Sequence, residues 1–356
     1  MPTTVRTSAP ARDRSTYDAF GRRIGLSSTT GRNSSMSYTD GRLASLTHAQ
    51  NGVTLTNLAY DYSVDGQLAG IRDLLDPVKS IEIDYDNLNR LVMVSEGIPT
   101  VDGGTPIPVE DFSYDGEGNR LSSHLSNLYL SDDHNRLTED SDYTYGYDSK
   151  GNRISRTAKL GGVVEAYTFN SVNKLVAYDS GDGTVATYHY DALGRRIAKV
   201  VDGAETAYVY DAWNPYSSVA NDILLEYSDG VLVRRWLHGS KVDEPLAFEA
   251  YSGTTGAGTG AINEVYADRQ GSILAVIDPV TGTKAAEYTY DSFGRLTQVT
   301  GTLSQPFAYT AREYDAETGL YYYRARYYDP ALVQFVSAAP IGFAAGDLNI
   351  YTYVEN

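Results

Sequence analysis

The chain has 356 residues, among them 31 Tyr, 33 Gly and no Cys, and a formal net charge of −17 at pH 7. Phosphates would repel so acidic a protein, so nucleic acid is not expected as a partner. The lack of Cys excludes disulfides and thiolate metal sites, and no apolar run approaches the length of a membrane span.

Residues 1–16 have no strand pattern or apolar signal-peptide core, and we expect them to be poorly structured. From residue 17 a unit recurs with the form aromatic-Asp-x-x-(Gly or Asn)-(Arg or Lys)-(Leu, Ile or Arg). A fixed period of this kind is typical of repeat architectures. Units begin at Tyr17, Tyr85, Phe169, Tyr190, Tyr210 and Tyr290, a variant without the early Asp begins at Tyr62, and units interpreted as one residue longer begin at Tyr114, Tyr147 and Tyr266.

The chemistry of the unit predicts a hairpin turn. An Asp at its second position can accept hydrogen bonds from the backbone that follows and so open a turn. The fifth position alternates between Gly and Asn, the residues that best tolerate a positive φ. We therefore predict type I turns closed by a left-handed residue. The turn residues are Asp18, Gly21, Asp86, Asn89, Asp191, Gly194, Asp291 and Gly294.

Between the turns, apolar residues alternate with polar ones, which favours strands over helices. The predicted fold is all-β, a long antiparallel meander over residues 17–308 that has to curl, split or close because large sheets twist. Gly- and Pro-rich residues 97–110 and 251–261 are interpreted as loops within it. A short helical turn is a further possibility at residues 315–318.

Tyr and Arg flank each turn at fixed places, so neighbouring hairpins are expected to line up rings and guanidiniums in rows. A structural role for these tyrosines is the preferred interpretation. The alternative is a row of aromatic platforms that binds carbohydrate.

The C-terminal residues depart from the repeat. Residues 314–330 read Tyr-Asp-Ala-Glu-Thr-Gly-Leu-Tyr-Tyr-Tyr-Arg-Ala-Arg-Tyr-Tyr-Asp-Pro, and residues 339–342 read Ala-Pro-Ile-Gly. This string resembles the core-associated segment of the Rhs (rearrangement-hotspot, or YD-repeat) family, and the repeats resemble YD repeats. By resemblance, the structural core residues are Tyr314, Asp315, Gly319, Tyr322, Arg324, Arg326, Tyr327, Tyr328, Asp329, Pro330, Pro340 and Gly342.

The resemblance implies a β-sheet wound spirally into a partial shell over residues 17–308, with a truncated core segment at 309–356. In toxin-carrying members of the family, the core segment plugs one end of the shell and cuts the chain after itself, leaving a toxin enclosed. The proposed protease uses two aspartates, each within Asp-Pro-x-Gly, which is sensible because paired carboxylates can serve as acid and base.

This chain departs from that pattern. Ala339 stands where the first aspartate is expected, and Asp-Pro-x-Gly occurs nowhere in the sequence. We therefore expect no catalytic residue: the chain is predicted to be a non-catalytic shell or scaffold segment, with an inactive remnant of an aspartyl autoprotease, that encloses or presents a toxin.

Other expectations complete this interpretation. No cofactor and no metal site is expected, because the five His lie far apart and the acidic cluster at 132–142 has no recognised ligand spacing. The expected partner is a toxin or other polypeptide cargo, with cognate shell fragments or carbohydrate as alternatives. Location is left open among secretion, display at a cell surface or wall, and delivery by a secretion system as part of a longer protein.

Overall fold

The computed structural model describes residues 13–97, 107–211, 222–252, 260–340, 342 and 349–353. Within them the chain is almost entirely antiparallel strand, with two short 3-10 turns, η1 (Pro77–Lys79) and η2 (Tyr309–Ala311). No helix in this part of the chain is long and apolar enough to cross a membrane.

The strands form three sheets, two of which are long meanders in strict chain order. The first is 10-stranded: β1 (Asp13–Tyr17), β2 (Arg23–Ser28), β3 (Arg32–Thr39), β4 (Arg42–Gln50), β5 (Val53–Tyr62), β6 (Leu68–Asp73), β7 (Ile81–Tyr85), β8 (Leu91–Glu96), β9 (Ile107–Tyr114) and β10 (Arg120–Ser123).

The second sheet is 16-stranded: β11 (Tyr129–Ser131), β12 (Leu137–Asp140), β13 (Tyr143–Tyr147), β14 (Arg153–Ala158), β15 (Val164–Phe169), β16 (Leu175–Asp179), β17 (Val185–Tyr190), β18 (Arg196–Val201), β19 (Ala204–Tyr210), β20 (Ile223–Ser228), β21 (Val231–His238), β22 (Pro245–Ala250), β23 (Ala261–Ala267), β24 (Ile273–Ile277), β25 (Lys284–Tyr290) and β26 (Leu296–Gly301). Residues 124–128 connect the two meanders, and an isolated bridge joins Ser123 to Ser126 within this connection.

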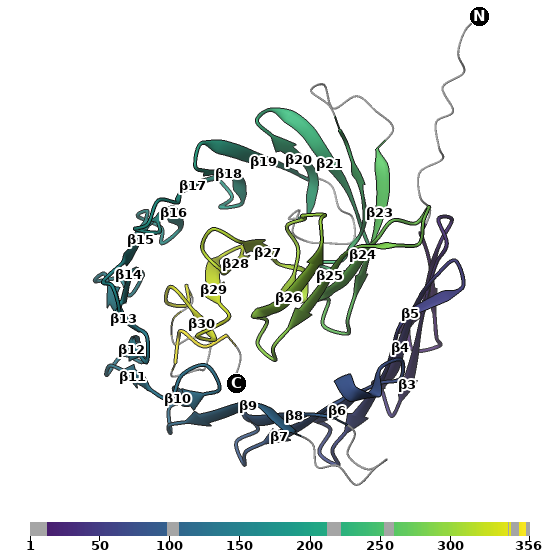
Figure 1. The fold of residues 1–356 in the computed structure, drawn as a ribbon, viewed down its shortest axis with the longest axis horizontal. Coiled ribbons are helices and arrows are strands. Elements are labelled where there is room, and N and C mark those ends of the chain that lie inside the picture. Colours follow the sequence, from purple (N-terminus) through teal and green to yellow (C-terminus); the bar gives the residue numbers. More distant parts are fainter. Residues whose placement is uncertain are drawn as a thin grey trace, which may run out of the picture.

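Together the two meanders form a curved wall that runs around a ring (Figure 1). The third sheet is 4-stranded and lies inside that ring: β27 (Glu313–Asp315), β28 (Leu320–Tyr323), β29 (Arg326–Asp329) and β30 (Gln334–Phe335). The predicted all-β meander is confirmed, and it is a spiral whose large sheets do not close by strand pairing.

The ring is completed by overlap, because the first strands of the wall lie outside β22 to β24 (Figure 1). Arg32 donates to the backbone oxygen of Val265 at 2.9 Å, and the hydroxyl of Tyr266 donates to Gln50 Oε1 at 2.6 Å. We call this polar boundary between the two turns of the spiral the seam. Its contacts join residues more than 200 positions apart.

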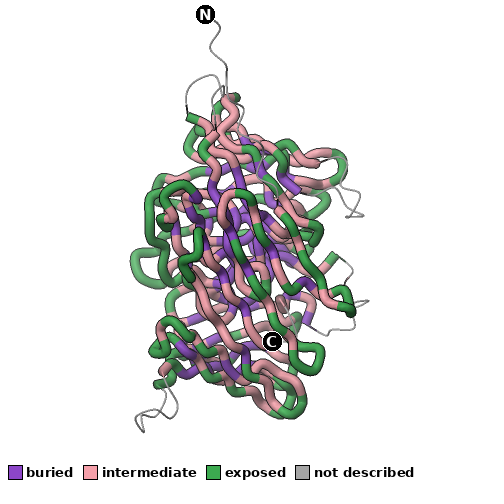
Figure 2. Tube along the Cα trace, turned by 90° about the vertical axis from the view of Figure 1, so that its right-hand side faces the viewer, coloured by how far each residue is buried: buried purple, intermediate pink, exposed green. Residues whose placement is uncertain are grey.

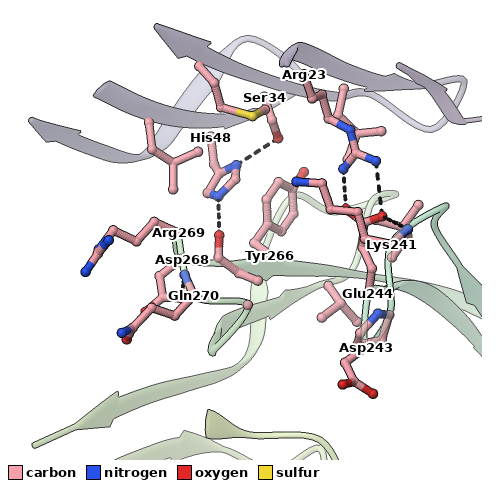
Figure 3. A pocket seen from close by; sticks show the side chains of 18 of the residues that line it. Arg23, Ser34, His48, Lys241, Asp243, Glu244, Tyr266, Asp268, Arg269 and Gln270 are labelled. Atoms are coloured by element: carbon pink, nitrogen blue, oxygen red, sulfur yellow. Dashed lines mark hydrogen bonds and ion pairs between the residues drawn. The ribbon is translucent and has the colours of Figure 1, made fainter. Parts of the chain in front are cut away.

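A cavity of about 230 Å³ lies in the seam (Figure 3). His48 bridges it: one ring nitrogen is 2.7 Å from Ser34 Oγ and the other is 2.8 Å from the backbone oxygen of Ala267. Burial lowers the pKa of His48 to about 4, so the ring is neutral near pH 7. Arg23 pairs with Glu244 at the other side of the cavity.

The predicted turn chemistry is found in the structure. Asn89 has a φ of 65° and Gly194 a φ of 78°, and their backbone N–H groups donate to the carbonyls of Asp86 and Asp191, each at 3.0 Å. The Asp side chain also accepts two backbone N–H groups, as Asp86 does from Leu88 and Arg90 at 2.9 Å. Gly21 and Gly294 close the turns at Asp18 and Asp291 in the same way, with φ of 75° and 91°.

The interpretation of the units at Tyr114 and Tyr147 as one residue longer is wrong. Gly118 donates to Asp115 O and Gly151 to Asp148 O with the spacing of the ordinary turn. An Asn fills the sixth position instead of Arg; Asn119 Nδ2, for example, donates to Asp115 Oδ2 at 2.9 Å. The seventh position of both units is therefore Arg.

The repeat tyrosines are tied to the hairpin before them. In several repeats the hydroxyl donates to the backbone oxygen of the seventh residue of the preceding unit, as Tyr114 does to Leu91 at 2.9 Å and Tyr210 to Arg196 at 2.7 Å. The sixth residue of the unit also contacts the next tyrosine: the Arg195 guanidinium lies 5.0 Å from the centre of the Tyr210 ring. Tyrosines elsewhere in the wall also donate to a backbone oxygen of an earlier hairpin: Tyr38 to Arg23, Tyr62 to Leu43, Tyr147 to Leu137, Tyr190 to Leu175 and Tyr290 to Ile273.

The ends of several segments can be compared with expectation. Strand β1 begins at Asp13, inside the range expected to be poorly structured, because residues 13–16 pair with β2; residues 1–12 lie outside the described part. The short helical turn considered at 315–318 is a single turn between β27 and β28, with Gly319 N donating to Asp315 O at 2.8 Å in the i to i+4 pattern. The interpretation of 97–110 and 251–261 as loops is wrong at 107–110, which begin β9, and at 261, which begins β23. Residues 98–106 and 253–259 lie outside the described part, as does most of the turn after Tyr210.

Buried positions are concentrated along the strands, while the turns at both rims are exposed (Figure 2). The seventh position of the unit contributes strongly to the buried face. It is apolar in Leu91 and Leu175 but charged in Arg153 and Arg196, and all four side chains are at most 8% exposed. A buried charge requires a partner, and the partners of these two arginines lie in the core segment.

Candidate functional site: the core segment inside the wall

The core segment, described at residues 309–340, 342 and 349–353, contains several of the most deeply buried side chains of the molecule. Tyr321 and Tyr328 are completely buried, and Tyr322 is 1% exposed. Tyr353 stacks on Tyr328 with ring centres 4.2 Å apart. Because burial disfavours the phenolate, the pKa values of Tyr321, Tyr322 and Tyr328 are raised and these rings stay neutral.

The core tyrosines bind the turns of the wall. The hydroxyl of Tyr321 donates to Gly294 O at 2.7 Å, and that of Tyr328 donates to Phe293 O at 2.8 Å. Tyr351 reaches Gly151 O at 2.9 Å in the same manner. All three acceptors belong to Asp turns, which share one rim of the meander. The core segment is therefore fastened at that rim.

A charged cluster joins the core to β18. The Arg196 guanidinium pairs with Asp315, and Lys199 Nζ lies 2.9 Å from Asp315 Oδ1 and 3.0 Å from Glu317 Oε2. Burial alone would raise the pKa of Asp315, but the charges of Arg196 and Lys199 outweigh it and lower that pKa below its usual value. The backbone N–H of Arg196 also donates to the hydroxyl of Tyr322 at 3.1 Å.

A second buried ion pair joins the core to β14. Arg153 Nη1 lies 2.9 Å from Asp329 Oδ2, and the two side chains are 3% and 4% exposed. The backbone N–H of Arg153 donates to Val336 O at 2.8 Å. Asp329 thus lies in a wall contact, with Pro330 buried directly after it.

The turn between β28 and β29 is held by two separate parts of the wall. Arg324 has a φ of 58° and donates to Asp243 Oδ1 at 2.5 Å, while Lys174 Nζ donates to the backbone oxygen of Arg324 at 2.7 Å. Arg326 lies over the Phe335 ring, 3.4 Å from its centre, and burial lowers its pKa to about 10.

The predicted core residues are thus brought together around β27 to β30. Tyr314 packs on Tyr321 at 5.0 Å, Tyr327 is 3% exposed and within 3.0 Å of Arg196 Nη1, and Gly319 has a φ of 71°.

Ala339 occupies a backbone turn at the end of the core. Its N–H donates to Ile350 O at 3.0 Å, and the N–H of Gly342 donates to Ala339 O at 2.8 Å. Pro340 is exposed and Gly342 has a φ of 54°. At this position the side chain is a methyl group, which has no proton to give or take. In the described part of the chain no group of three or more His, Asp or Glu side chains is arranged to hold a metal ion.

Sequence reasoning missed the wall partners of the core. Arg153 and Arg196 carry the two buried ion pairs, and the signal was a charged residue at a position filled by Leu or Ile in other repeats. Glu110 was also missed: it accepts from Ser292 N at 3.0 Å where the last hairpin meets β9, but its sequence context is an ordinary strand.

Comparison with known proteins agrees with this geometry. The family model described as the teneurin YD-shell matches residues 75–221. The tRNA nuclease WapA of Bacillus subtilis is 31% identical over 290 residues, which cover 76% of this chain and 11% of that protein. The toxin protein Tse5 of Pseudomonas aeruginosa is 28% identical over 353 residues, covering 83% of this chain and 26% of Tse5. The chain belongs to the Rhs/YD-repeat family.

Solved structures show the same fold. A Tc holotoxin pore of Photorhabdus luminescens superposes with a TM-score of 0.73 at 19% identity, covering 97% of this YD-repeat chain and 18% of the other. A TcdB2–TccC3 crystal structure gives a TM-score of 0.74 at 18% identity, with 96% and 19% covered. The YD-repeat chain thus spans about a tenth to a quarter of the length of the relatives described here.

Proposed function

We propose that this YD-repeat chain is a length of shell wall with its internal plug, and that it encloses a polypeptide cargo, of the toxin class, without transforming it. The observation that carries the proposal is the attachment of the core segment. Two buried ion pairs and a set of Tyr hydroxyls fasten it to the inside of the wall at one rim. A segment held in this way blocks one end of the ring.

The names of the relatives support a polypeptide cargo, since WapA is named a nuclease and Tse5 a toxin. The chain covers only a small share of both proteins, so their named activities are not carried over to it. The wall itself presents Tyr rings whose hydroxyls are already bonded to backbone carbonyls, which suits a structural role.

We further propose that the chain does not cut itself. The resemblance to self-cleaving relatives places a carboxylate at position 339, and this chain has a methyl group there. A peptide-bond hydrolysis that depends on two carboxylates sharing a proton has no acid–base pair when one is replaced by Ala.

A protease-protection experiment tests enclosure. An unstructured, protease-sensitive polypeptide is fused after Asn356, so that it continues from Tyr353, which lies against the buried core. The matched control carries the same polypeptide ahead of β1, on the outer turn of the spiral. We expect the first fusion to resist a broad-specificity protease and the second to be digested at once. Equal digestion of the two would refute enclosure.

A further inference from the structure

The wall ends in a strand with an unpaired edge. Among the described residues, β26 forms a ladder only with β25, through pairs that run from Ala286 with Gly301 to Tyr290 with Leu296. Residues 297–301 are all exposed, so both faces of the strand and its outer edge are open. An edge of this kind presents backbone N–H and C=O groups that can accept a further strand.

The sequence of this edge lacks the usual protection against pairing. Leu296–Gly301 reads Leu-Thr-Gln-Val-Thr-Gly, with no charge and no Pro. The other terminal strand of the wall, β1, carries Asp13 and Arg14. Proteins normally blunt an exposed edge with charges, Pro or bulges, and β26 has two β-branched Thr and a Val instead.

Its position explains how such an edge is tolerated. The hairpin of β25 and β26 lies inside the ring, away from the outer surface (Figure 1). It is held firmly: Tyr290 donates to Ile273 O at 2.8 Å, and the Phe293 ring packs edge-on against Phe112 at 5.3 Å. The edge is therefore a fixed template on the inner side of the ring.

We propose that the free edge of β26 pairs with an extended segment of the enclosed polypeptide and adds it to the wall as one more strand. This inference rests on the enclosure proposed above. Main-chain hydrogen bonds would supply the affinity, so the edge would accept many sequences, and the small uncharged neighbours favour a segment that is weakly charged and free of Pro. The ladder then continues beyond the last strand encoded by the repeats.

Hydrogen exchange tests the pairing. Two fusions after Asn356 carry cargo of equal length, one containing a stretch of alternating Thr and Val and the other the same stretch interrupted by Pro. Exchange at residues 297–301 is measured in both fusions and in the chain alone, alongside protease protection of the cargo. We expect exchange to slow by ~10-fold or more in the Thr–Val fusion only.

The outcomes separate the two proposals. Protected cargo with unchanged exchange at 297–301 overturns the pairing and leaves enclosure standing. Digested cargo with unchanged exchange overturns both. A third outcome is hydrogen exchange at 297–301 that is slow in the chain without cargo, and slower at higher protein concentration. That result identifies a second copy of the chain as the occupant and overturns the pairing with cargo.

A pair of proline variants gives an internal check. Neighbouring residues of a strand point their N–H groups to opposite sides, so one of Gln298→Pro and Val299→Pro removes a bond to β25 and the other blocks the free edge. The variant that keeps the thermal stability of the chain is the edge blocker. We expect it to abolish the slowing of exchange while the cargo stays protected from protease; retained slowing would contradict the pairing.

Discussion

Arg196 of β18 and Asp315 of β27 form an ion pair across 119 positions of sequence, and each side chain is 1% exposed. The pair ties the wall to the core. Because both charges are removed from water, each depends on the other, and Lys199 cannot fully replace the guanidinium.

We therefore expect Arg196→Met to lower the free energy of unfolding by about 3 kcal/mol, because it leaves a buried carboxylate with one partner fewer. The matched control is Arg195→Met, which breaks the pair with Asp191, where the side chains are 24% and 20% exposed. It should cost less than about 1 kcal/mol. Urea denaturation of both variants measures the difference, and equal losses would contradict the role given to Arg196.

The hydroxyl of Tyr114 is expected to hold neighbouring hairpins together through Leu91 O. Tyr114→Phe keeps the ring but leaves a carbonyl unpaired, so it should cost about 1 kcal/mol in unfolding free energy. Tyr17→Phe, at a ring that is 50% exposed, should cost less than about 0.5 kcal/mol because water replaces the lost partner. A chemical denaturation series compares the two, and a similar cost at both sites would mean that the bond to Leu91 O contributes nothing.

Two glycines in the same turn position should respond differently to Ala. Gly21 and Gly294 both have positive φ, so either substitution costs about 1–2 kcal/mol in backbone strain. A Cβ on Gly294 would also lie 2.3 Å from the Tyr309 ring, whereas one on Gly21 meets open space. Gly294→Ala should therefore cost a further ~2 kcal/mol. Thermal unfolding of both variants tests this, and identical shifts would show that the core relaxes freely around Tyr309.

Glu110 should make stability depend on pH. Burial first, and the Asp291 carboxylate second, raise its pKa to about 7 from 4.5, while hydrogen bonds from Ser292 oppose the rise. Because the folded pKa is the higher one, the stabilising contribution of Glu110 is complete below pH 4.5 and is lost as pH rises through 7.

The Glu110→Gln variant lacks this titration. We expect its unfolding free energy, relative to the parent chain, to rise by up to about 3 kcal/mol between pH 4.5 and 8. Unfolding in buffers across that range measures the difference. A difference that is flat with pH would mean that Glu110 is ionised throughout.

Ala339→Asp alone should stay uncut. One added carboxylate provides half of the acid–base pair that the chemistry requires. Purified variant and parent are incubated for days near neutral and acidic pH, and the chain length is followed by mass spectrometry. A discrete internal cut in the variant that is absent from the parent would show that a second carboxylate is already in place.

The local features of the fold were predictable because they depend on neighbours in sequence. Asn89 and Gly194 close turns with positive φ, as the alternation of Gly and Asn indicated. The longer unit assigned at Tyr114 was wrong, since Asn119 takes over the place of Arg and bonds the turn Asp. The sequence shows the Asn, but only the hydrogen bonds show that it takes the place of Arg in the turn.

The spiral and the site were harder to predict because they depend on how far the wall curves. No local pattern says that Tyr266 will meet Gln50, or that Arg153 will meet Asp329. The buried charge at the seventh position was the available signal. It indicated that a partner was needed, and only the curvature of the wall decides which residue supplies it.

The direction of the Tyr bonds has a consequence for how the protein is made. Tyr114 reaches back to Leu91 and Tyr210 to Arg196, so each new hairpin finds its acceptor in the part of the chain already synthesised. Arg153 and Arg196 likewise precede Asp329 and Asp315. A wall built in this order can assemble hairpin by hairpin at the ribosome, since domains form from the N-terminus during synthesis. The core segment then follows the wall strands that it contacts, at a rim already shaped to receive it.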